Sequence, residues 1–220
     1  PVLCWLTRLA KDQGDEIPLR LVKGAYWDSE LKWAQQAGEG GYPLYTRKAG
    51  TDVSYLACAR YLLSEATRGA IYPQFATHNA QTVASIDAMA GNRIYEFQRL
   101  HGMGQELYDT MLAESGAKAV RIYAPIGAHK DLLPYLVRRL LENGANTSFV
   151  HKLVDPNTPI ESLVVHPLVT LLGYKSLANQ KIVKPADIFG AERKNSKGLN
   201  MNIISESEPF SAALDKYSDT

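Results

Sequence analysis

Four short apolar runs mark the first two thirds of the chain, and a segment with helical periodicity follows each of them. The runs are rich in β-branched and aromatic residues, which favours strands, whereas the following segments space their apolar residues three and four apart. Alternation of strands and helices at this spacing is typical of parallel strands in βα units. The predicted strands are residues 18–25, 71–78, 94–101 and 119–127.

Three further helical patterns accompany these units. The opening residues 1–16 read as an amphipathic helix already in progress, and we take this beginning as a sign of a fragment. Two more helical pieces, residues 28–37 and 52–66, lie between the first and second predicted strands. The loop that joins them is rich in glycine and too polar for a core.

The last third of the sequence changes character at about Val154. Proline, asparagine and serine become frequent, and the alternation of strands and helices stops. We therefore predict one domain over residues 1–154 and a loop-rich arm over residues 155–220. The arm is predicted to hold one helix near residues 160–173.

Four βα units are half of a (β/α)8 barrel, which needs about 250 residues when complete. The same four parallel strands could instead form an open, doubly wound sheet. No G-x-G-x-x-G pattern follows any of the strands, which weakens the dinucleotide-binding version of that alternative.

Composition excludes several classes of function. The formal net charge of +1 argues against a general nucleic-acid surface, which needs a concentrated basic patch. Two cysteines, Cys4 and Cys58, cannot build a disulfide framework, no Cys/His spacing suits zinc, and a reducing compartment is the simplest inference. No run of about 18 apolar residues occurs, so the sequence predicts no membrane-spanning helix.

Polar residues gather where the predicted strands end, which is where parallel α/β folds carry their chemistry. An ordinary interpretation stays open, in which these are loop residues and Thr77 or Asn79 caps the next helix. The residues at the four strand ends are Lys23, Tyr26 and Trp27; Thr77, His78 and Asn79; Gln98, Arg99 and His101; and Arg121 and Tyr123.

Two cations stand inside the first apolar run, "RLVKGAYWD". Arg20 and Lys23 lie on opposite faces if the side chains alternate with a period of two. A buried cation is costly unless it is paired. Each therefore needs an anion or an electron-rich partner.

The last predicted helix, "DLLPYLVRRLLENGAN", carries two distinct stripes. One interpretation is a solvated polar face with weak Arg–Glu pairs. The other is a clamp in which two adjacent guanidiniums bind one substrate carboxylate. The apolar arc is Leu133, Leu136, Val137, Leu140 and Leu141, and the opposite stripe is Tyr135, Arg138, Arg139 and Glu142.

Five strings, in order, carry a resemblance to a known family: "RLVKGAYWD", "YPQFATHN", "YEFQRLHGMG", "RIYAP" and "YLVRRLLENGANTSF". They resemble the proline dehydrogenase domain of the bacterial bifunctional proline utilization flavoproteins, over roughly residues 1–200. The resemblance implies a distorted (β/α)8 TIM-type barrel with non-covalent FAD, of which this chain holds the C-terminal half. It also implies oxidation of L-proline to Δ1-pyrroline-5-carboxylate, with electrons passed to a membrane quinone.

The resemblance assigns roles to particular residues. Arg20 and Tyr123 match catalytic positions, and Glu142 matches a support of the substrate site. The implied contacts of proline are Tyr123, Tyr135, Arg138 and Arg139. The implied contacts of FAD are Arg20, Val22, Lys23, Gly24, Ala25, Trp27, Thr46, Thr77, His78, Asn79, Gln98, Leu100, Glu142 and Phe149, with Arg20 beside the flavin, Lys23 near the phosphates and Trp27 on the adenine. No metal site is expected.

Several further expectations follow from the resemblance. The end of the chain, "PADIFGAERKNSKGLNMN", looks like the connection into an aldehyde dehydrogenase module, the other part of the bifunctional polypeptide. A cytoplasmic location is implied, and peripheral contact with the inner membrane and a homo-oligomer both stay open. The first barrel strands, with a substrate-binding lysine and an acidic residue near the flavin, have no counterpart here. We therefore expect the isolated chain to be inactive and to need companion residues.

Two rival functions stay open. A barrel lyase or aldolase would use Lys23 to form a Schiff base, and it requires that lysine inside the barrel. A non-catalytic fragment that scaffolds a larger polypeptide is the other rival. The presence of bound flavin would distinguish the proline dehydrogenase interpretation from both rival functions.

Overall fold

The structure is a computed structural model, and it describes residues 1–24, 26–115, 119–144 and 155–218. The chain divides into two compact units. We call residues 1–25 with 48–175 the sheet unit and residues 26–47 with 176–220 the arm unit. Each unit is described by itself.

The sheet unit is built on four parallel strands in chain order, β1-β2-β3-β4. A doubly wound sheet reverses its strand order at a switch point, whereas a barrel adds its strands in sequence. The described strands therefore form part of a barrel, as predicted, and each ends earlier than predicted because the chain turns into a polar loop. The strands are Ile17–Leu21 (β1), Ile71–Ala76 (β2), Glu96–Leu100 (β3) and Ala119–Tyr123 (β4).

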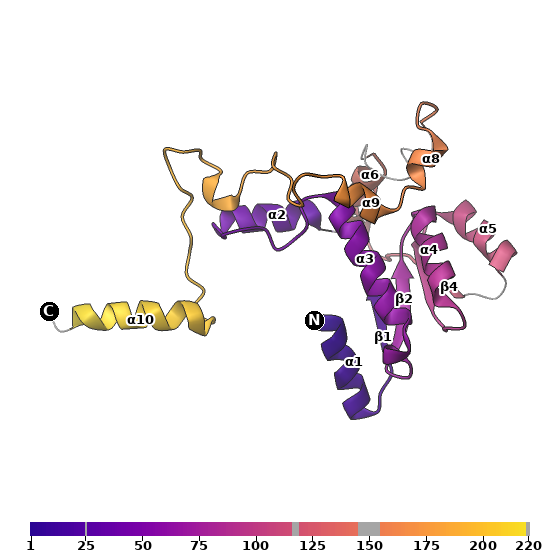
Figure 1. Cartoon of the computed structure of the whole chain (residues 1–220), viewed down its shortest axis with the longest axis horizontal. Coiled ribbons are helices and arrows are strands. Elements are labelled where there is room, and N and C mark those ends of the chain that lie inside the picture. The colour runs from indigo at the N-terminus through magenta and orange to yellow at the C-terminus, as the bar shows by residue number, and fades with distance from the viewer. Residues whose placement is uncertain (25, 116–118, 145–154, 219–220) are drawn as a thin grey trace. The chain divides into compact units, whose positions relative to one another are not determined.

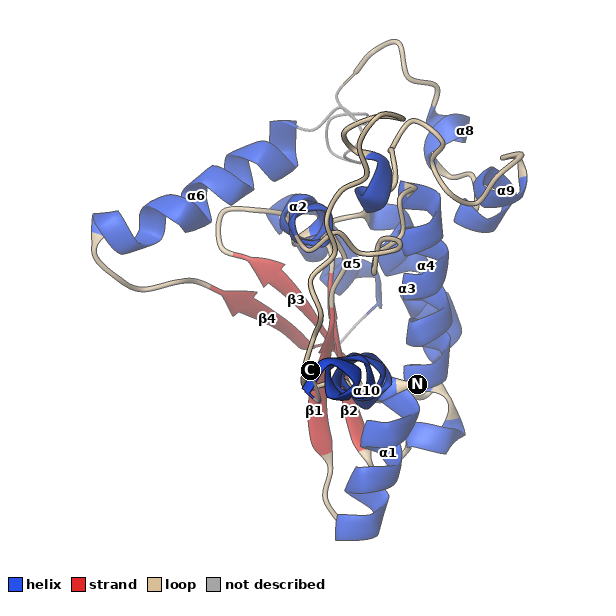
Figure 2. Ribbon diagram, turned by 90° about the vertical axis from the view of Figure 1, so that its left-hand side faces the viewer, coloured by secondary structure: helices blue, strands red, loops and turns tan. Residues whose placement is uncertain are grey.

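Helices follow the strands as the periodicity predicts. Helices α3 and α4 cover one face of the sheet, and the strands lie to one side of them in Figure 2. Side chains on β2 show the consequence, since Ile71, Pro73 and Phe75 are buried while the alternate residues are half-buried. The helices of this unit are Val2–Gln13 (α1), Lys48–Leu63 (α3), Ala80–Ala90 (α4), Gln105–Ser115 (α5) and His129–Gly144 (α6).

An aromatic cluster forms the core between the sheet and its helices. Phe97 is fully buried, and its ring centroid lies 5.3 Å from that of Tyr95, 5.6 Å from that of Tyr108 and 6.4 Å from that of Phe75. Such edge-on and tilted contacts add to the free energy gained by burying large side chains. The core therefore fixes the covered face of the sheet and leaves the other face for polar groups.

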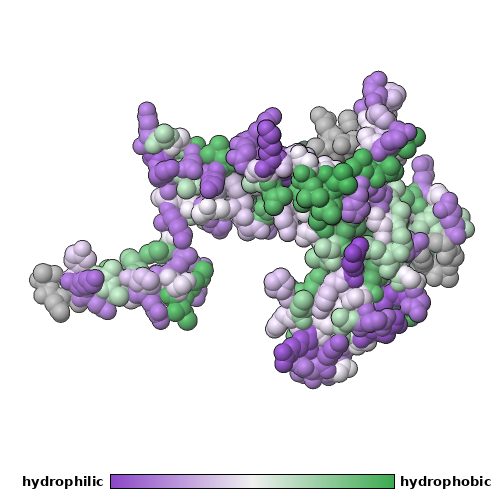
Figure 3. All heavy atoms as spheres, in the orientation of Figure 1, coloured by the Kyte–Doolittle hydropathy of each residue, from purple (hydrophilic) through white to green (hydrophobic). Residues whose placement is uncertain are grey.

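The helices in the region after residue 154 differ from the prediction. The single helix expected near residues 160–173 is replaced by two short helices, Ile160–Leu163 (α8) and Pro167–Leu172 (α9). The break falls at His166, whose side chain caps α9 directly before Pro167. Apolar side chains gather on the visible face of the sheet unit where α9 lies (Figure 3), and Val169 and Leu172 are among the exposed ones.

The arm unit also holds a helix that the sequence did not predict, Ile204–Ser218 (α10). Pro209 lies inside it and hid the helical pattern, because proline normally ends a helix. The other elements of this unit are Trp27–Gln36 (α2) and the short 3-10 helix Pro185–Asp187 (η2) (Figure 1). The predicted boundary at residue 154 lies outside the described residues and stays a prediction, whereas the compact units divide the chain elsewhere.

Phe97→Ala should lower the free energy of unfolding by about 3–5 kcal/mol, because it removes a ring from the centre of the aromatic cluster. Ile94→Ala is the matched control, since the Ile94 side chain just before β3 is exposed and its loss should change the value by about 0.5 kcal/mol or less. Urea titrations of the full-length protein measure both. Equal effects of the two substitutions would contradict the position of the core.

Candidate functional site

The uncovered face of the sheet carries a row of polar side chains. The register pairs Arg20 with Gln74, Gln74 with Glu96, and Gln98 with Arg121. Paired residues of neighbouring strands point to the same face. Four predicted site residues therefore share the uncovered face: Arg20, Gln98, Leu100 and Tyr123.

Glu96 is the centre of this row and was missed by the sequence analysis. Its carboxylate is buried and accepts hydrogen bonds from Arg121 Nε at 2.5 Å and Nη2 at 2.9 Å. Gln74 Nε2 at 2.7 Å and the Tyr72 hydroxyl at 3.2 Å complete its set of donors. The hydrogen bonds of Arg121 hold the pKa of the Glu96 carboxyl below its usual value. A carboxylate between the aromatic residues Tyr95 and Phe97 was the available signal.

Arg20 and Lys23 point to opposite faces, as the period of two predicts. Lys23 Nζ donates to Asp52 Oδ1 at 2.6 Å and to Thr82 Oγ1 at 3.2 Å, so it lies on the side of the sheet that α3 and α4 cover. It also lies 4.9 Å from the centre of the Tyr55 ring. Burial lowers the pKa of Lys23, and Asp52 opposes that effect. This buried cation is therefore paired.

The turn after β2 is held by its own side chains. The Thr77 hydroxyl accepts from Asn79 N at 3.2 Å, and Asn79 Oδ1 accepts from Thr82 N at 2.9 Å, which caps α4. The ordinary interpretation of Asn79 as a helix cap is confirmed. Thr82 Oγ1 also donates to Asn79 Oδ1 at 3.2 Å and accepts from Lys23, which links two predicted site residues.

His78 is neutral in this site. Burial, followed by the positive charges of Arg139 and Arg99, lowers the pKa of His78 to about 4. Its Nε2 accepts a hydrogen bond from Leu100 N at 3.1 Å, so the single ring proton lies on Nδ1. Gly104 lies against the ring, because a Cβ at this position would come within 2.9 Å of His78 Cδ2. The backbone around His78 therefore fixes both its position and its tautomer.

Helix α6 turns its polar stripe inward. Tyr135, Arg138 and Arg139 are half-buried, whereas all five residues of the apolar arc that contains Leu136 and Leu140 are exposed. A helix that only covers a core shows the reverse arrangement. These three side chains are therefore not fully solvated, whereas the expected pairs with Glu142 involve a side chain outside the described ones and stay a prediction.

The inward stripe meets the end of β4. The ring centroids of Tyr123 and Tyr135 lie 6.5 Å apart, and the Arg139 guanidinium lies 5.1 Å from the centre of the Tyr135 ring. Arg139 is also close enough to His78 to affect its pKa. The Tyr135 hydroxyl is buried, and among the described residues no hydrogen-bond partner is found for it. A buried hydroxyl without a hydrogen-bond partner among the described residues is a candidate for contact with a ligand.

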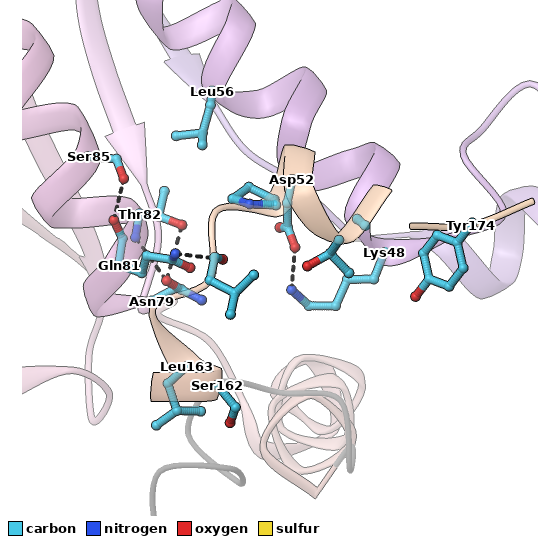
Figure 4. A pocket seen from close by; sticks show the side chains of 14 residues that line it. Lys48, Asp52, Leu56, Asn79, Gln81, Thr82, Ser85, Ser162, Leu163 and Tyr174 are labelled. Atoms are coloured by element: carbon cyan, nitrogen blue, oxygen red, sulfur yellow. Dashed lines mark hydrogen bonds and ion pairs between the residues drawn. The ribbon is translucent and has the colours of Figure 1, made fainter. Parts of the chain in front are cut away.

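One cavity of about 250 Å³ is bounded by α3, α4 and the segment that holds α8 and α9. Figure 4 shows Lys48 and Asp52 at one end, paired at 2.5 Å, and Asn79 with Thr82 at the other. Gln81 Nε2 donates to Val165 O at 2.9 Å and holds the later segment in place. Asn79 is the one predicted site residue in the lining, so this cavity is a neighbour of the candidate site.

Several predicted residues fall outside this group. Trp27 and Thr46 belong to the arm unit, where Trp27 Nε1 donates to Tyr45 O at 2.9 Å. Val22 is exposed, and Gly24 has a φ of 74°, a conformation that favours glycine. The structure does not describe Ala25, Phe149 or the side chain of Glu142.

Among the described residues, no group of three or more His, Cys, Asp or Glu side chains could hold a metal ion. Among the helices of the described ranges, none combines the length and the apolar character that a membrane crossing requires.

Comparison with protein-family models matches residues 1–152 to the family "Proline dehydrogenase". Among curated proteins, the chain is 50% identical over 227 residues to "Bifunctional protein PutA" of Escherichia coli (strain K12), covering 97% of this chain and 17% of that protein. It is 32% identical over 155 residues to "Proline dehydrogenase 1, mitochondrial" of Homo sapiens, covering 66% of this chain and 25% of that protein.

Solved structures agree with these matches. The chain is similar to proline utilization A (PutA) of Bradyrhizobium japonicum, with a TM-score of 0.85 and 47% identity over 94% of this chain and 21% of that one. For PutA of Bdellovibrio bacteriovorus the TM-score is 0.78 and the identity 33%, over 98% of this chain and 22% of that one. The chain thus spans about a quarter or less of the length of each of these proteins.

Acid should destabilise the fold through His78. The unfolded chain binds a proton on this histidine near pH 6.5, whereas the folded chain binds it only near pH 4. The free energy of unfolding should therefore fall as the pH falls from about 6.5 to about 4. His78→Gln keeps an acceptor for Leu100 N–H and should remove part of this loss, as urea titrations over that pH range would measure.

His129→Gln is the matched control for this experiment, because His129 is an exposed histidine of α6. It should keep the pH dependence of the parent protein. A His78→Gln protein that loses as much stability on acidification as the control would contradict the buried, neutral histidine.

Proposed function

Because this chain belongs to the proline dehydrogenase family, we propose that it is part of an FAD-dependent enzyme that oxidises L-proline to Δ1-pyrroline-5-carboxylate. The observation that carries the proposal is the inward polar stripe of α6. It brings a guanidinium, two tyrosines and a neutral histidine together beside the carboxyl ends of the strands. A small amino acid needs such a site, with apolar walls and a few polar anchors.

The substrate carboxylate is assigned to Arg138 and Arg139. Guanidiniums suit this role, since their forked N–H groups match the two oxygens of a carboxylate. The rings of Tyr123 and Tyr135 are assigned to the walls around the pyrrolidine ring. The buried Tyr135 hydroxyl supports this assignment, because a bound substrate would supply the hydrogen-bond partner that it lacks among the described residues. Glu142 is assigned to hold the arginines.

The donor set also fits FAD. When bound, the flavin supplies the chemistry by accepting the hydride that proline loses. Lys23, a cation paired with Asp52 on the side of α3 and α4, is assigned to the phosphates, and the amides of Gln98 and Asn79 offer neutral donors. His78 offers its Nδ1 hydrogen, and it keeps this donor over the pH range above its low pKa. The further contacts assigned to FAD are Val22, Gly24, Ala25, Trp27, Thr46, Thr77, Leu100, Glu142 and Phe149.

Arg20 is assigned to the edge of the flavin. Its place on the uncovered face, in register with Gln74, supports this role because that face also carries Gln98 and Tyr123. A fixed cation there would stabilise negative charge that develops on an electron-rich ring. The row of neutral and charged partners around Glu96 supplies a rigid floor for the same face.

The rival lyase or aldolase function requires Lys23 inside the barrel, and the structure does not meet that condition. A Schiff-base lysine must reach substrate on the uncovered face, whereas Lys23 Nζ is bound to Asp52 and Thr82 on the side of α3 and α4.

We further propose that a membrane quinone accepts the electrons, that the rest of the polypeptide holds an aldehyde dehydrogenase module, and that the enzyme is cytoplasmic with peripheral membrane contact. The isolated chain should be inactive.

The first test is the absorption spectrum of the full-length protein. We expect the bands of an oxidised flavin, which should bleach when proline is added without oxygen. An equal concentration of alanine, added in place of proline, is the control and should leave the flavin bands unchanged. A colourless protein that FAD cannot reconstitute would overturn the proposed function.

Arg139→Met in the full-length enzyme should raise the KM for proline by roughly tenfold to a hundredfold, because a charged hydrogen bond is worth about 1.5–3 kcal/mol. The FAD content should stay level. Lys130→Met, which removes an exposed cation from the same helix, should leave both quantities unchanged. Loss of FAD with an unaltered KM would show that the clamp is wrongly assigned.

A further inference from the structure

Within the arm unit, a late segment of the chain runs against the residues around α2 in the opposite direction. We call residues 176–196 the strap and residues 26–47 the α2 segment. Side chains of both segments make hydrogen bonds to the backbone of the other. The described part of the strap has a single short 3-10 helix, η2, and no strand. Its backbone groups therefore find many of their partners in the α2 segment.

The first group of contacts holds the end of the α2 segment. Arg47 Nε donates to Ser176 O at 3.0 Å and to Ala178 O at 3.3 Å. Asn179 N donates to Thr46 Oγ1 at 2.9 Å. The strap thus holds the side chains of Thr46 and Arg47 at the end of this segment.

Trp27 is fixed through the same end. Its indole Nε1 donates to Tyr45 O at 2.9 Å, and Tyr45 directly precedes Thr46. The start of α2 is therefore tied to the residue beside the strap contact. Both residues assigned to FAD in this unit, Trp27 and Thr46, depend on one short stretch of backbone.

The second group of contacts holds the C-terminal end of α2 and the loop that follows it. Asn195 Nδ2 donates to Gln35 O at 2.6 Å and to Pro185 O at 3.1 Å. The Tyr42 hydroxyl donates to Val183 O at 2.6 Å and accepts from Gln35 Nε2 at 2.9 Å. Because Pro185 is buried, this end of the strap is packed as well as hydrogen-bonded.

Gly38 marks the closest approach of the two segments. Its φ of 61° favours glycine, and a Cβ built there would lie 1.9 Å from Ser196 O and 2.6 Å from Ser196 C. Both atoms belong to the backbone, so a larger residue must displace the strap. Gly41 and Gly69 meet nothing within 4 Å, and of these two only Gly69, which precedes β2 in the sheet unit, has a positive φ, 71°.

We propose that the strap positions the α2 segment for the adenine end of FAD. This inference rests on the proposed function. A loop without regular structure loses conformational entropy when it orders around a ligand, and a segment that holds it beforehand removes that cost from binding. The strap residues are positioning residues, because they act through Thr46 and Trp27 and have no assigned contact with substrate.

The test is Gly38→Ala in the full-length holoenzyme, with Gly41→Ala and Gly69→Ala as matched controls. Gly41→Ala controls for a methyl group in the same loop, and Gly69→Ala controls for backbone strain at a positive φ outside the strap. FAD is removed and added back, and the Kd is measured from the flavin fluorescence. Gly38→Ala should weaken FAD binding by about tenfold or more, which corresponds to about 1.4 kcal/mol, while both controls stay within about twofold.

Two further readouts separate positioning from catalysis. At saturating FAD, the KM for proline of Gly38→Ala should equal that of the parent enzyme. Limited proteolysis of the apoprotein should cleave within residues 37–47 faster in Gly38→Ala than in the controls. Asn195→Asp, which replaces the amide donor by an acceptor of the same shape, should move FAD binding and proteolysis in the same direction, and it decides the question if Gly38→Ala does not fold.

The outcomes are distinct. A parent protein that binds FAD, with Gly38→Ala and Asn195→Asp as tight as the controls, overturns the inference alone. Weakened FAD binding in the Gly69→Ala control to the same degree also overturns it, since backbone strain anywhere in the chain would then explain the effect. A parent protein that cannot be reconstituted with FAD overturns the proposed function and this inference together.

Discussion

Alternation of side chains along four parallel strands decides where the polar groups of the sheet unit lie. Because the register is fixed, an apolar residue under α3 and α4 puts its neighbour on the uncovered face. Glu96 is the clearest case, since it alternates with fully buried Phe97 and receives Arg121, Gln74 and Tyr72. A shift of one residue in register would bury these charges against the aromatic core, so core and polar face specify the same register.

Helix α6 obeys a different constraint. Its apolar arc is exposed in this chain, and its polar stripe is half-buried beside Tyr123. Burying two adjacent guanidiniums costs free energy that their neighbours must offset. Tyr135 supplies an aromatic face to Arg139, and a substrate carboxylate would supply the opposite charge. The orientation of this helix is thus difficult to explain by folding alone and simple to explain by binding.

Local patterns predicted the strands, the helices that follow them and the opposite directions of Arg20 and Lys23, because each depends on periodicity within a few residues. The pattern also placed polar residues at the strand ends, whereas their individual roles came from the resemblance and the orientation of the α6 stripe came from the structure. Partners distant in sequence could not be predicted. Lys23 finds Asp52 and Thr82 only once α3 and α4 are packed on the sheet, and α10 was missed because Pro209 disrupts its pattern.

The same reasoning explains why the arm looked like a loop. Its strap carries no long-range periodicity, since side chains of the α2 segment accept or donate hydrogen bonds at some of its backbone groups and short turns of the strap satisfy others. Such a segment has no sequence signature of its own, yet it is specified residue by residue through Arg47, Tyr42 and Asn195. The contacts that hold Thr46 and Gln35 come from residues 176–196, so the α2 segment makes them only when the strap is in place. In the scheme proposed for FAD, the strap thereby supports two of the assigned contacts, Trp27 and Thr46.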